Sequence, residues 1–219
     1  TTIASTLEAR EKRARTGGVV SFNYQSIFDS PDHPTPTKAP VPAGKPFNVV
    51  MLSMESVGMV SMERPGANTT PFLDKMKKEG VFFNSFYACV PHSIKSIFSY
   101  HSGQYPVASM AAITVSRPRV PIKGLPQHFK DHGYRTALLH GGRFSFSSKL
   151  DFLSGRGYDI MYDAESLPNR KEHEKISWGI DDQAIFEYAK TFIKQSDEPF
   201  YVQFISVMGH HPYRLVEHW

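Results

Sequence analysis

Short apolar runs alternate with amphipathic stretches along most of this chain. Four runs have the length of a strand: 47–54, 81–88, 135–140 and 199–208. Uninterrupted apolar runs of this length are typical of parallel strands that are buried on both faces. The pattern therefore predicts a sheet whose two faces are both covered by other elements.

Helical signals fill the intervals between these runs. Pro71 suits the first position of a helix that Thr70 can cap, and Gly133 suits a helix end. A helical period of 3.6 residues is clearest at Ile185, Ala189 and Phe192. Helices are predicted over 71–79, 93–102, 125–133, 148–157 and 180–196. The resulting order predicts an α/β fold with three layers, α/β/α, around a mostly parallel sheet.

The N-terminal part has a different composition. Residues 7–15 predict a short charged helix, and residues 30–46 are rich in proline, which favours an extended linker. We therefore expect an N-terminal helix and linker over 1–46. The remaining residues, 47–219, form the expected catalytic domain.

Composition narrows the functional classes. With 219 residues, 40% of them hydrophobic, the chain can build one globular domain with a substantial core. The net charge of +4 suits anionic ligands, but no stripe of basic and aromatic residues indicates nucleic-acid binding. The single cysteine excludes an internal disulfide and a cysteine-based zinc site. No apolar run reaches the roughly 20 residues that span a membrane.

Two residues are candidates for chemistry on an anion. Glu55 follows the first apolar run, so it should emerge at the carboxyl edge of the sheet, where it could bind a cation or act as a base. Ser93 opens a predicted helix, whose N–H groups favour an anion, and Lys95 could neutralise charge there. The alternatives are a solvated carboxylate and a serine that only caps its helix.

Histidines follow two further strands. His140 ends the run 135–140, and His210 lies in the segment 209–213, with the sequence GHHPY, just after the last strand. Histidines beyond strand ends can bind a metal or donate hydrogen bonds to an anion. The alternative is a turn that carries surface histidines.

Taken in order, these segments resemble the N-terminal half of the sulfatase family of the alkaline phosphatase superfamily. The matching motifs are a strand with a terminal carboxylate (48–55), a helix and strand (70–83) and a nucleophile segment before a G-x-Y-P turn (93–106). The segments 140–159, 177–189 and GHHPY resemble the lipoteichoic-acid-synthase-like, or phosphoglycerol-transferase-like, branch. The resemblance extends from Phe47 to Tyr213.

This resemblance implies an alkaline-phosphatase-like fold and a metal-dependent phosphotransferase or phosphohydrolase. Its substrate would be an anionic phosphoester head group, such as phosphoglycerol. The resemblance assigns Ser93 as the nucleophile and Glu55 with Ser93 as metal ligands. It also implies that the substrate is bound by Lys95, His140, Lys149 and His210. Mn²⁺ or Zn²⁺ suits a mixed carboxylate and imidazole site better than Ca²⁺ or Mg²⁺.

The nucleophile has one competitor. Cys89-Val-Pro-His resembles the start of the C-x-P-x-R motif in which sulfatases oxidise cysteine to formylglycine, but Ser93 stands in the place of the arginine. The spacing to the G-x-Y-P turn also selects Ser93. An unmodified hydroxyl favours phosphate over sulfate esters. A sulfuric ester hydrolase remains the alternative, and a non-catalytic anion-binding fragment or pseudoenzyme is a further one.

The family completes its metal site with an Asp-His pair after the histidine segment, and no such pair follows Tyr213 here. We therefore expect a C-terminal segment of the same protein as a partner, beside the anionic substrate and without nucleic acid. We also expect an extracytoplasmic location, with an anchor in a removed upstream segment.

Overall fold

The computed structural model describes residues 44, 46–58, 69–83, 85–107, 111–214 and 216. The chain divides into two compact units, 1–45 and 46–219, and everything below concerns the second. The charged helix expected over 7–15 and nearly all of the proline-rich linker lie outside the described residues. Within the described part, no helix is long and apolar enough to cross a membrane.

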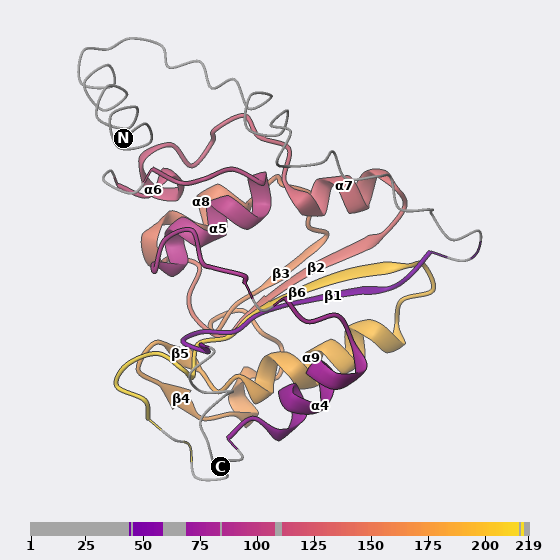
Figure 1. Cartoon of the computed structure of the whole chain (residues 1–219), viewed down its shortest axis with the longest axis vertical. Coiled ribbons are helices and arrows are strands. Elements are labelled where there is room, and N and C mark those ends of the chain that lie inside the picture. The colour runs from indigo at the N-terminus through magenta and orange to yellow at the C-terminus, as the bar shows by residue number, and fades with distance from the viewer. Residues whose placement is uncertain are drawn as a thin grey trace. The chain divides into compact units, whose positions relative to one another are not determined.

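A four-stranded parallel sheet forms the middle layer (Figure 1). The strands are β1 (Val49–Ser53), β2 (Arg135–His140), β3 (Ile160–Tyr162) and β6 (Phe200–Ile205). Their order in space is β1-β6-β2-β3, so the last strand lies between the first two. All three pairings are parallel, and the register aligns Val50 with Val202 and Ala137 with Val202. The sheet predicted from the apolar runs is confirmed.

Helices cover both faces of this sheet (Figure 1). One face carries α5 (Ser93–Ser102), α6 (Ile113–Ser116), α7 (Leu125–Asp131) and α8 (Lys149–Leu153). The other face carries α4 (Pro71–Glu79) and α9 (Gln183–Lys194). Two 3-10 turns, η1 (Phe146–Ser148) and η2 (Arg170–Glu172), and a hairpin of β4 (Lys175–Ile176) and β5 (Gly179–Ile180) complete the described elements. The three-layer α/β/α fold is therefore confirmed.

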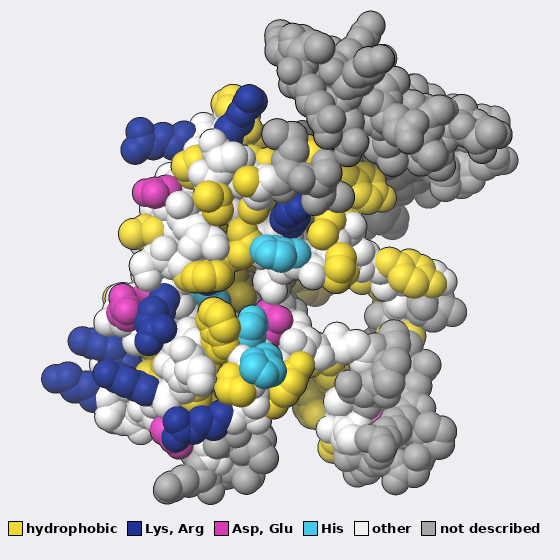
Figure 2. All heavy atoms as spheres, turned by 90° about the vertical axis from the view of Figure 1, so that its left-hand side faces the viewer, with side chains coloured by type: hydrophobic (Ala, Val, Ile, Leu, Met, Phe, Trp, Pro, Cys, Tyr) yellow, Lys and Arg dark blue, Asp and Glu magenta, His cyan; other side chains and the backbone are white. Residues whose placement is uncertain are grey.

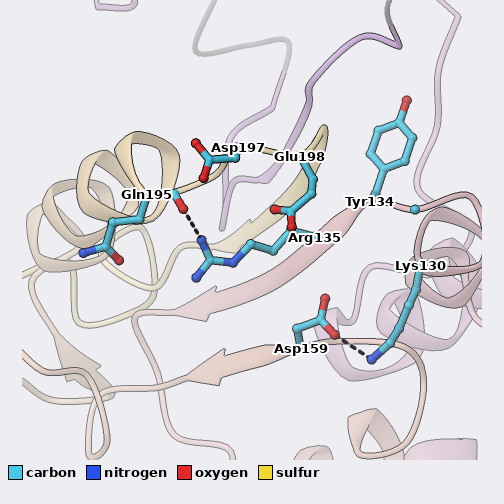
Figure 3. Close-up of a pocket in the computed structure, with 8 residues that line it drawn as sticks. Lys130, Tyr134, Arg135, Asp159, Gln195, Asp197 and Glu198 are labelled. Carbon is cyan, nitrogen blue, oxygen red and sulfur yellow. Dashed lines mark hydrogen bonds and ion pairs between the residues drawn. The ribbon is translucent and has the colours of Figure 1, made fainter.

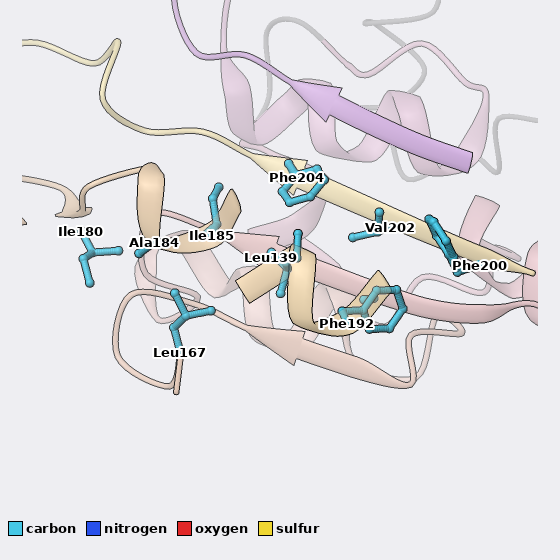
Figure 4. Close-up of a cluster of buried hydrophobic side chains, with 11 residues drawn as sticks. Leu139, Leu167, Ile180, Ala184, Ile185, Phe192, Phe200, Val202 and Phe204 are labelled. Atoms are coloured by element: carbon cyan, nitrogen blue, oxygen red, sulfur yellow. The ribbon is translucent and has the colours of Figure 1, made fainter. Parts of the chain in front are cut away.

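Two apolar clusters hold the layers together. The cluster between α9 and the sheet includes Leu139, Ile185, Phe192, Val202 and Phe204 (Figure 4). Alternate residues of a strand point to opposite faces, so neighbours of these residues serve the second cluster under α5 and α8. That second cluster contains Ile94, Ile97, Phe98, Leu138, Phe144, Phe152, Leu153 and Ile205. Burial on both faces explains why β2 and β6 are nearly continuous apolar runs.

Two elements differ from the sequence prediction. The run 81–88 forms no strand in its described residues, and Val81, Phe83 and Phe86 are exposed. A strand needs a neighbour to bond its backbone, and no described strand pairs with this run. The helix expected over 148–157 is shorter, because η1 precedes it with left-handed residues and α8 ends at Leu153.

Candidate functional site

The carboxyl ends of β1, β2 and β6 meet at the face that Figure 2 shows, where histidine side chains gather near an acidic one. Glu55 lies two residues after β1, and Ser93 is the first residue of α5. The Ser93 hydroxyl donates a hydrogen bond of 2.9 Å to Oε2 of Glu55. Two residues that are 38 positions apart in the sequence are therefore in contact at this edge.

The Glu55 main chain and carboxylate are fixed by neighbouring serines. Its backbone N–H donates to Oγ of Ser206, just beyond β6, at 2.8 Å. Ser56 Oγ donates to the other carboxylate oxygen, Oε1, at 3.3 Å. A Cβ added at Gly209 would collide with the Glu55 carbonyl oxygen, so only glycine permits this close approach of the two loops.

Ser93 does not cap its helix. His92 occupies the N-cap position in extended conformation, and no side-chain cap bond is present there. Ser93 is exposed, and its hydroxyl donates a hydrogen bond to the Glu55 carboxylate instead. The alternative in which this serine serves only as a cap is therefore wrong. The helix N-terminus behind it directs backbone N–H groups toward the same space.

The far end of α5 is anchored to the sheet by a buried polar chain. His101 is 3% exposed, and its Nδ1 lies 2.8 Å from the Ile97 carbonyl oxygen. Its Nε2 lies 2.8 Å from the Tyr158 hydroxyl, which donates to Oε1 of Gln203 on β6. Burial lowers the pKa of His101 to about 4. This chain fixes the helix that carries Ser93.

His140 and Lys149 form a second pair, under the same edge. Lys149 Nζ donates to Nε2 of His140 at 2.6 Å, and Nδ1 of the same ring lies 3.0 Å from the Ile205 carbonyl oxygen and 3.2 Å from the Gly142 backbone nitrogen. Burial, and then the charge of Lys149, lower the pKa of His140 to about 3. Burial also lowers the pKa of Lys149 to about 8, although the charges of Asp163 and Glu55 oppose the shift.

Asp182 holds the turn after β6. It stands at the N-cap position of α9 but makes no cap bond there. Its carboxylate accepts hydrogen bonds from the N–H groups of Val207, at 2.9 and 3.0 Å, and Met208, at 2.9 Å. Burial raises the pKa of Asp182 to about 6, against the lowering effect of those bonds, and the charges of Asp181 and then Glu55 add to the rise. Asp182 thus positions the segment that leads to His210.

Trp178 forms an aromatic contact with His210. The two ring centroids are 4.3 Å apart, and the indole N–H donates to the His211 carbonyl oxygen at 2.5 Å. Phe146 also meets the indole edge to face, with ring centroids 5.9 Å apart. Lys149 Nζ lies 5.5 Å from the centre of the Phe146 ring. Aromatic side chains therefore link the His210 turn to the His140–Lys149 pair.

Strained backbone is concentrated in these same loops. Four non-glycine residues of the described part have a positive φ: Ser56, Ser147, Ser148 and Tyr213. Ser56 follows Glu55, the two middle serines precede Lys149, and Tyr213 ends the GHHPY segment. Residues other than glycine adopt this conformation at a cost, and such strain clusters at functional sites.

The structure thus brings the candidates together as two pairs, Glu55 with Ser93 and His140 with Lys149. The charge of Glu55 acts on Lys149, which links the pairs electrostatically. Lys95 lies in the first turn of α5 and is half-buried. Among the described residues, no group of three or more His, Cys, Asp or Glu side chains is arranged to hold a metal ion.

Sequence reasoning missed Asp182 and Trp178. An aspartate just before a helix predicts a cap, so the sequence gives no signal for a carboxylate that reaches to another turn. Trp178 belongs to a segment that supported the family resemblance, but its contact with His210 depends on the fold.

One hollow lies away from these residues, at the amino ends of β2 and β6 (Figure 3). It measures about 630 Å³ and is lined by charged residues, which include Lys130, Arg135 and Asp159. Lys130 pairs with Asp159 at 2.5 Å, and Arg135 donates to the Gln195 carbonyl oxygen at 2.8 Å. These side chains are engaged in structural contacts, and ligands of open α/β sheets bind at the opposite edge.

Comparisons with known proteins identify the family of this chain. The sulfatase family model matches residues 47–218. Lipoteichoic acid synthase 2 of Bacillus subtilis is 24% identical over 78% of this chain and 27% of its own length. Phosphoglycerol transferase I of Xanthomonas euvesicatoria pv. vesicatoria is 30% identical over 40% of this chain and 13% of its own. The chain thus spans less than a third of the length of these relatives.

Solved structures show the same fold. An alkaline phosphatase superfamily protein from Vibrio parahaemolyticus superposes with a TM-score of 0.67 and 28% identity, over 80% of this chain and 43% of that one. The lipoteichoic acid synthase LtaP from Listeria monocytogenes also gives 0.67, with 23% identity over 77% of this chain and 42% of that one. The chain belongs to the sulfatase family, an enzyme family of the alkaline phosphatase superfamily.

Proposed function

We propose that this chain carries the nucleophile half of a phosphoglycerol-transferase-like enzyme, in which Ser93 attacks an anionic phosphoester. The observation that carries the proposal is the 2.9 Å contact between Ser93 Oγ and Glu55 Oε2 at the carboxyl edge of the sheet. The names of the relatives, lipoteichoic acid synthase and phosphoglycerol transferase, support a phosphoglycerol head group as the substrate.

A divalent cation fits beside this contact. Two oxygen ligands of one small cation lie about 3 Å apart when each is about 2 Å from it, which agrees with the separation of Glu55 Oε2 and Ser93 Oγ. When bound, the cation would lower the pKa of the serine hydroxyl and polarise the phosphoester. Mn²⁺ or Zn²⁺ is our candidate, with further ligands from a C-terminal segment of the same protein.

The chain's own residues account for the rest of the transfer. Ser93 Oγ forms the new bond to phosphorus and gives its proton to solvent water, while Glu55 Oε2, the atom that accepts its hydrogen bond here, would hold the cation. The P–O bond to the lipid alcohol breaks, and that alcohol takes up a proton from water as it leaves. Lys95, Lys149 and His210 bind the charge on the phosphoryl oxygens. The buried His140 holds the Lys149 ammonium in place.

The same contact favours serine over Cys89 as the nucleophile. Cys89 is an exposed free cysteine four residues before the helix, whereas Ser93 contacts the carboxylate. An unmodified hydroxyl favours a phosphoester substrate over a sulfate ester. We further propose that the reaction takes place outside the cytoplasm, as the synthesis of lipoteichoic acid by the named relatives suggests.

The test uses the full-length gene product. Phosphatidylglycerol vesicles serve as the donor, and p-nitrophenyl sulfate tests sulfatase activity. Ser93→Ala should lower turnover of the phospholipid by at least about a thousandfold, because losing a nucleophile removes the covalent step. Cys89→Ala and Ser96→Ala, which removes a hydroxyl bonded only to backbone carbonyl oxygens, should leave it nearly unchanged.

Two outcomes would contradict the proposal. Near-normal turnover in Ser93→Ala with loss in Cys89→Ala would support formylglycine chemistry and a sulfuric ester hydrolase instead. Metal binding without turnover of either substrate would support a non-catalytic anion-binding protein. Calorimetric titration with Mn²⁺ or Zn²⁺ checks the ligand set, since Glu55→Gln should weaken binding by at least about tenfold.

A further inference from the structure

A buried glutamine interrupts the apolar run of β6. Gln203 is fully buried, and the parallel register aligns it with Met51 on β1 and Leu138 on β2. Its neighbours Val202 and Phe204 belong to the cluster on the α9 face, so the Gln203 side chain points to the face that α5 covers. A buried amide costs free energy unless its polar atoms are bonded. A polar residue at this position therefore requires partners within the fold.

Tyrosines on both sides of Gln203 supply such partners. Its Oε1 accepts hydrogen bonds from the hydroxyls of Tyr158, at 2.5 Å, and Tyr201, at 3.0 Å. The Tyr158 hydroxyl also lies 2.8 Å from Nε2 of His101 on α5. The Tyr201 hydroxyl lies 3.2 Å from Sδ of Met51 on β1. One amide group thus connects a helix and a strand that are far apart in the sequence.

Tyr100 extends this cluster along α5. Its hydroxyl and Nε2 of Gln203 are both buried, and neither has a hydrogen-bond partner among the described residues. Burial, and then Tyr201, raise the pKa of Tyr100, whereas the side chains of Ser53 and Gln203 oppose the rise. Ser53 ends β1 and lies two residues before Glu55. The polar cluster therefore reaches from α5 to the end of β1.

We propose that Gln203 is a positioning residue for the transfer reaction, because it fixes α5 relative to β1. Ser93 begins α5 and Glu55 follows β1, so the position of the helix sets the 2.9 Å contact between Ser93 Oγ and Glu55 Oε2. The apolar contacts under α5 are non-directional and hold the helix against the sheet. Hydrogen bonds are directional and select one rotation and one register of the helix.

This role makes Gln203 more important for activity than for stability. A reacting group that is misplaced by about 1 Å can lose about a hundredfold in rate. The Nε2 atom without a partner lowers stability, and an apolar side chain of similar shape removes that cost. In Gln203→Met, the Tyr158 hydroxyl keeps His101 as a neighbour, and the Tyr201 hydroxyl keeps Met51. The midpoint of thermal unfolding should therefore stay unchanged or rise.

Steady-state kinetics of the full-length gene product with phosphatidylglycerol vesicles test the role, which rests on the proposed function. Gln203→Met should lower kcat at least about tenfold and leave KM unchanged, because only the nucleophile is misplaced. Tyr158→Phe, which removes one hydroxyl of the cluster, should have the same effect. The double variant should be no slower than the slower single variant. Gln195→Met, the same change at an exposed residue, should alter neither constant.

Hydrogen exchange tests the position of α5 without any measurement of activity. The backbone amides of α5 should exchange at least about fivefold faster in Gln203→Met than in the unmodified protein. The amides of α9, which packs on the other face of the sheet, should exchange at an unchanged rate.

Unchanged values of both kcat and α5 exchange in Gln203→Met would overturn the proposal. A lower unfolding midpoint with faster exchange in α9 as well as α5 would also overturn it, because a residue that only supports the fold behaves in this way. Should Gln203→Met fail to fold, Tyr158→Phe decides by the same readouts. If the unmodified protein transfers no phosphoglycerol but α5 exchanges faster in Gln203→Met, the proposed function fails and the positioning of α5 stands.

Discussion

The centre and the edge of the sheet differ in how completely they are packed. Leu139 on β2 is fully buried between the sheet and α9, whereas Leu52 on β1, on the same face, is 41% exposed. The two halves of the candidate site follow this division. His140, Lys149 and Asp182 are buried in the packed centre, and Glu55 and Ser93 stand at the end of the open strand. The packed half is buried by described elements on both faces of the sheet, and the other half lies at the end of a strand whose outer edge no described strand pairs.

Truncating one leucine in each region should give the largest contrast. Leu139→Ala removes a fully buried side chain and should lower the free energy of unfolding by about 3 kcal/mol, because a cavity remains. Leu52→Ala should cost less than about 1 kcal/mol in the 219-residue chain, because water already reaches the side chain. Urea unfolding of both variants measures this. Equal losses would mean that the edge is as well packed as the centre.

Replacing Lys149 tests how much the burial of its ammonium group lowers the free energy of unfolding. Its lowered pKa means that the ammonium is less stable in the folded chain than in the unfolded one at pH 7. Lys149→Met should therefore stabilise the chain by about 2 kcal/mol while it weakens binding of inorganic phosphate. Chemical denaturation and a phosphate titration provide the two readouts. A destabilised variant would show that the ammonium contributes more through its bond to His140 than its burial costs.

Acid should weaken the packed centre through His101. Its pKa is about 4 in the folded chain and near 6.5 when unfolded, so between these values the unfolded state binds more protons. The free energy of unfolding should fall by about 1 kcal/mol per pH unit as the pH drops from 6.5 toward 4. His101→Gln, which cannot titrate, should show a shallower pH dependence. Parallel slopes for the two proteins would assign the effect to other groups.

The smallest expected effect concerns the contact between Trp178 and the turn that carries His210. Trp178→Phe keeps an aromatic ring against His210 but removes the N–H that donates to the His211 carbonyl oxygen. The variant should lose about 0.5–1 kcal/mol of stability, the usual contribution of one hydrogen bond. Trp178→Ala, which also removes the ring contact, should lose more in the same thermal unfolding experiment. If the two variants are equally stable, the ring contact contributes nothing.

Much of the packed region could be predicted from the sequence, because uninterrupted apolar runs and helical periods report burial directly. The strands at 49–53, 135–140 and 200–205 and the helix that Ser93 opens agree with those patterns. The run 81–88 could not be placed correctly, since an apolar run reports only the tendency to pair and a strand forms only beside a neighbour. The short strand β3 and the hairpin of β4 and β5 carry too few residues for a periodic signal.

The candidate site was predictable to a lesser extent. Glu55 follows a predicted strand and Ser93 begins a predicted helix, so the sequence placed both at the same edge of the sheet. In the structure, Ser93 Oγ lies 2.9 Å from Glu55 Oε2. The position of Lys149 against His140 depends on two consecutive left-handed serines, Ser147 and Ser148, a conformation that local sequence does not announce. The reach of Asp182 to the turn after β6 likewise requires the folded arrangement of α9 and the sheet.

Mass spectrometry of one peptide tests the central claim, that Ser93 is the nucleophile. Trypsin should release residues 79–95 as one peptide, because Lys78 and Lys95 flank it, and this peptide contains both Cys89 and Ser93. After brief reaction of the full-length gene product with phosphatidylglycerol and acid quenching, fragmentation should locate a phosphoglycerol adduct on Ser93, with Cys89 unmodified. A formylglycine at position 89 and an unmodified Ser93 would contradict the account.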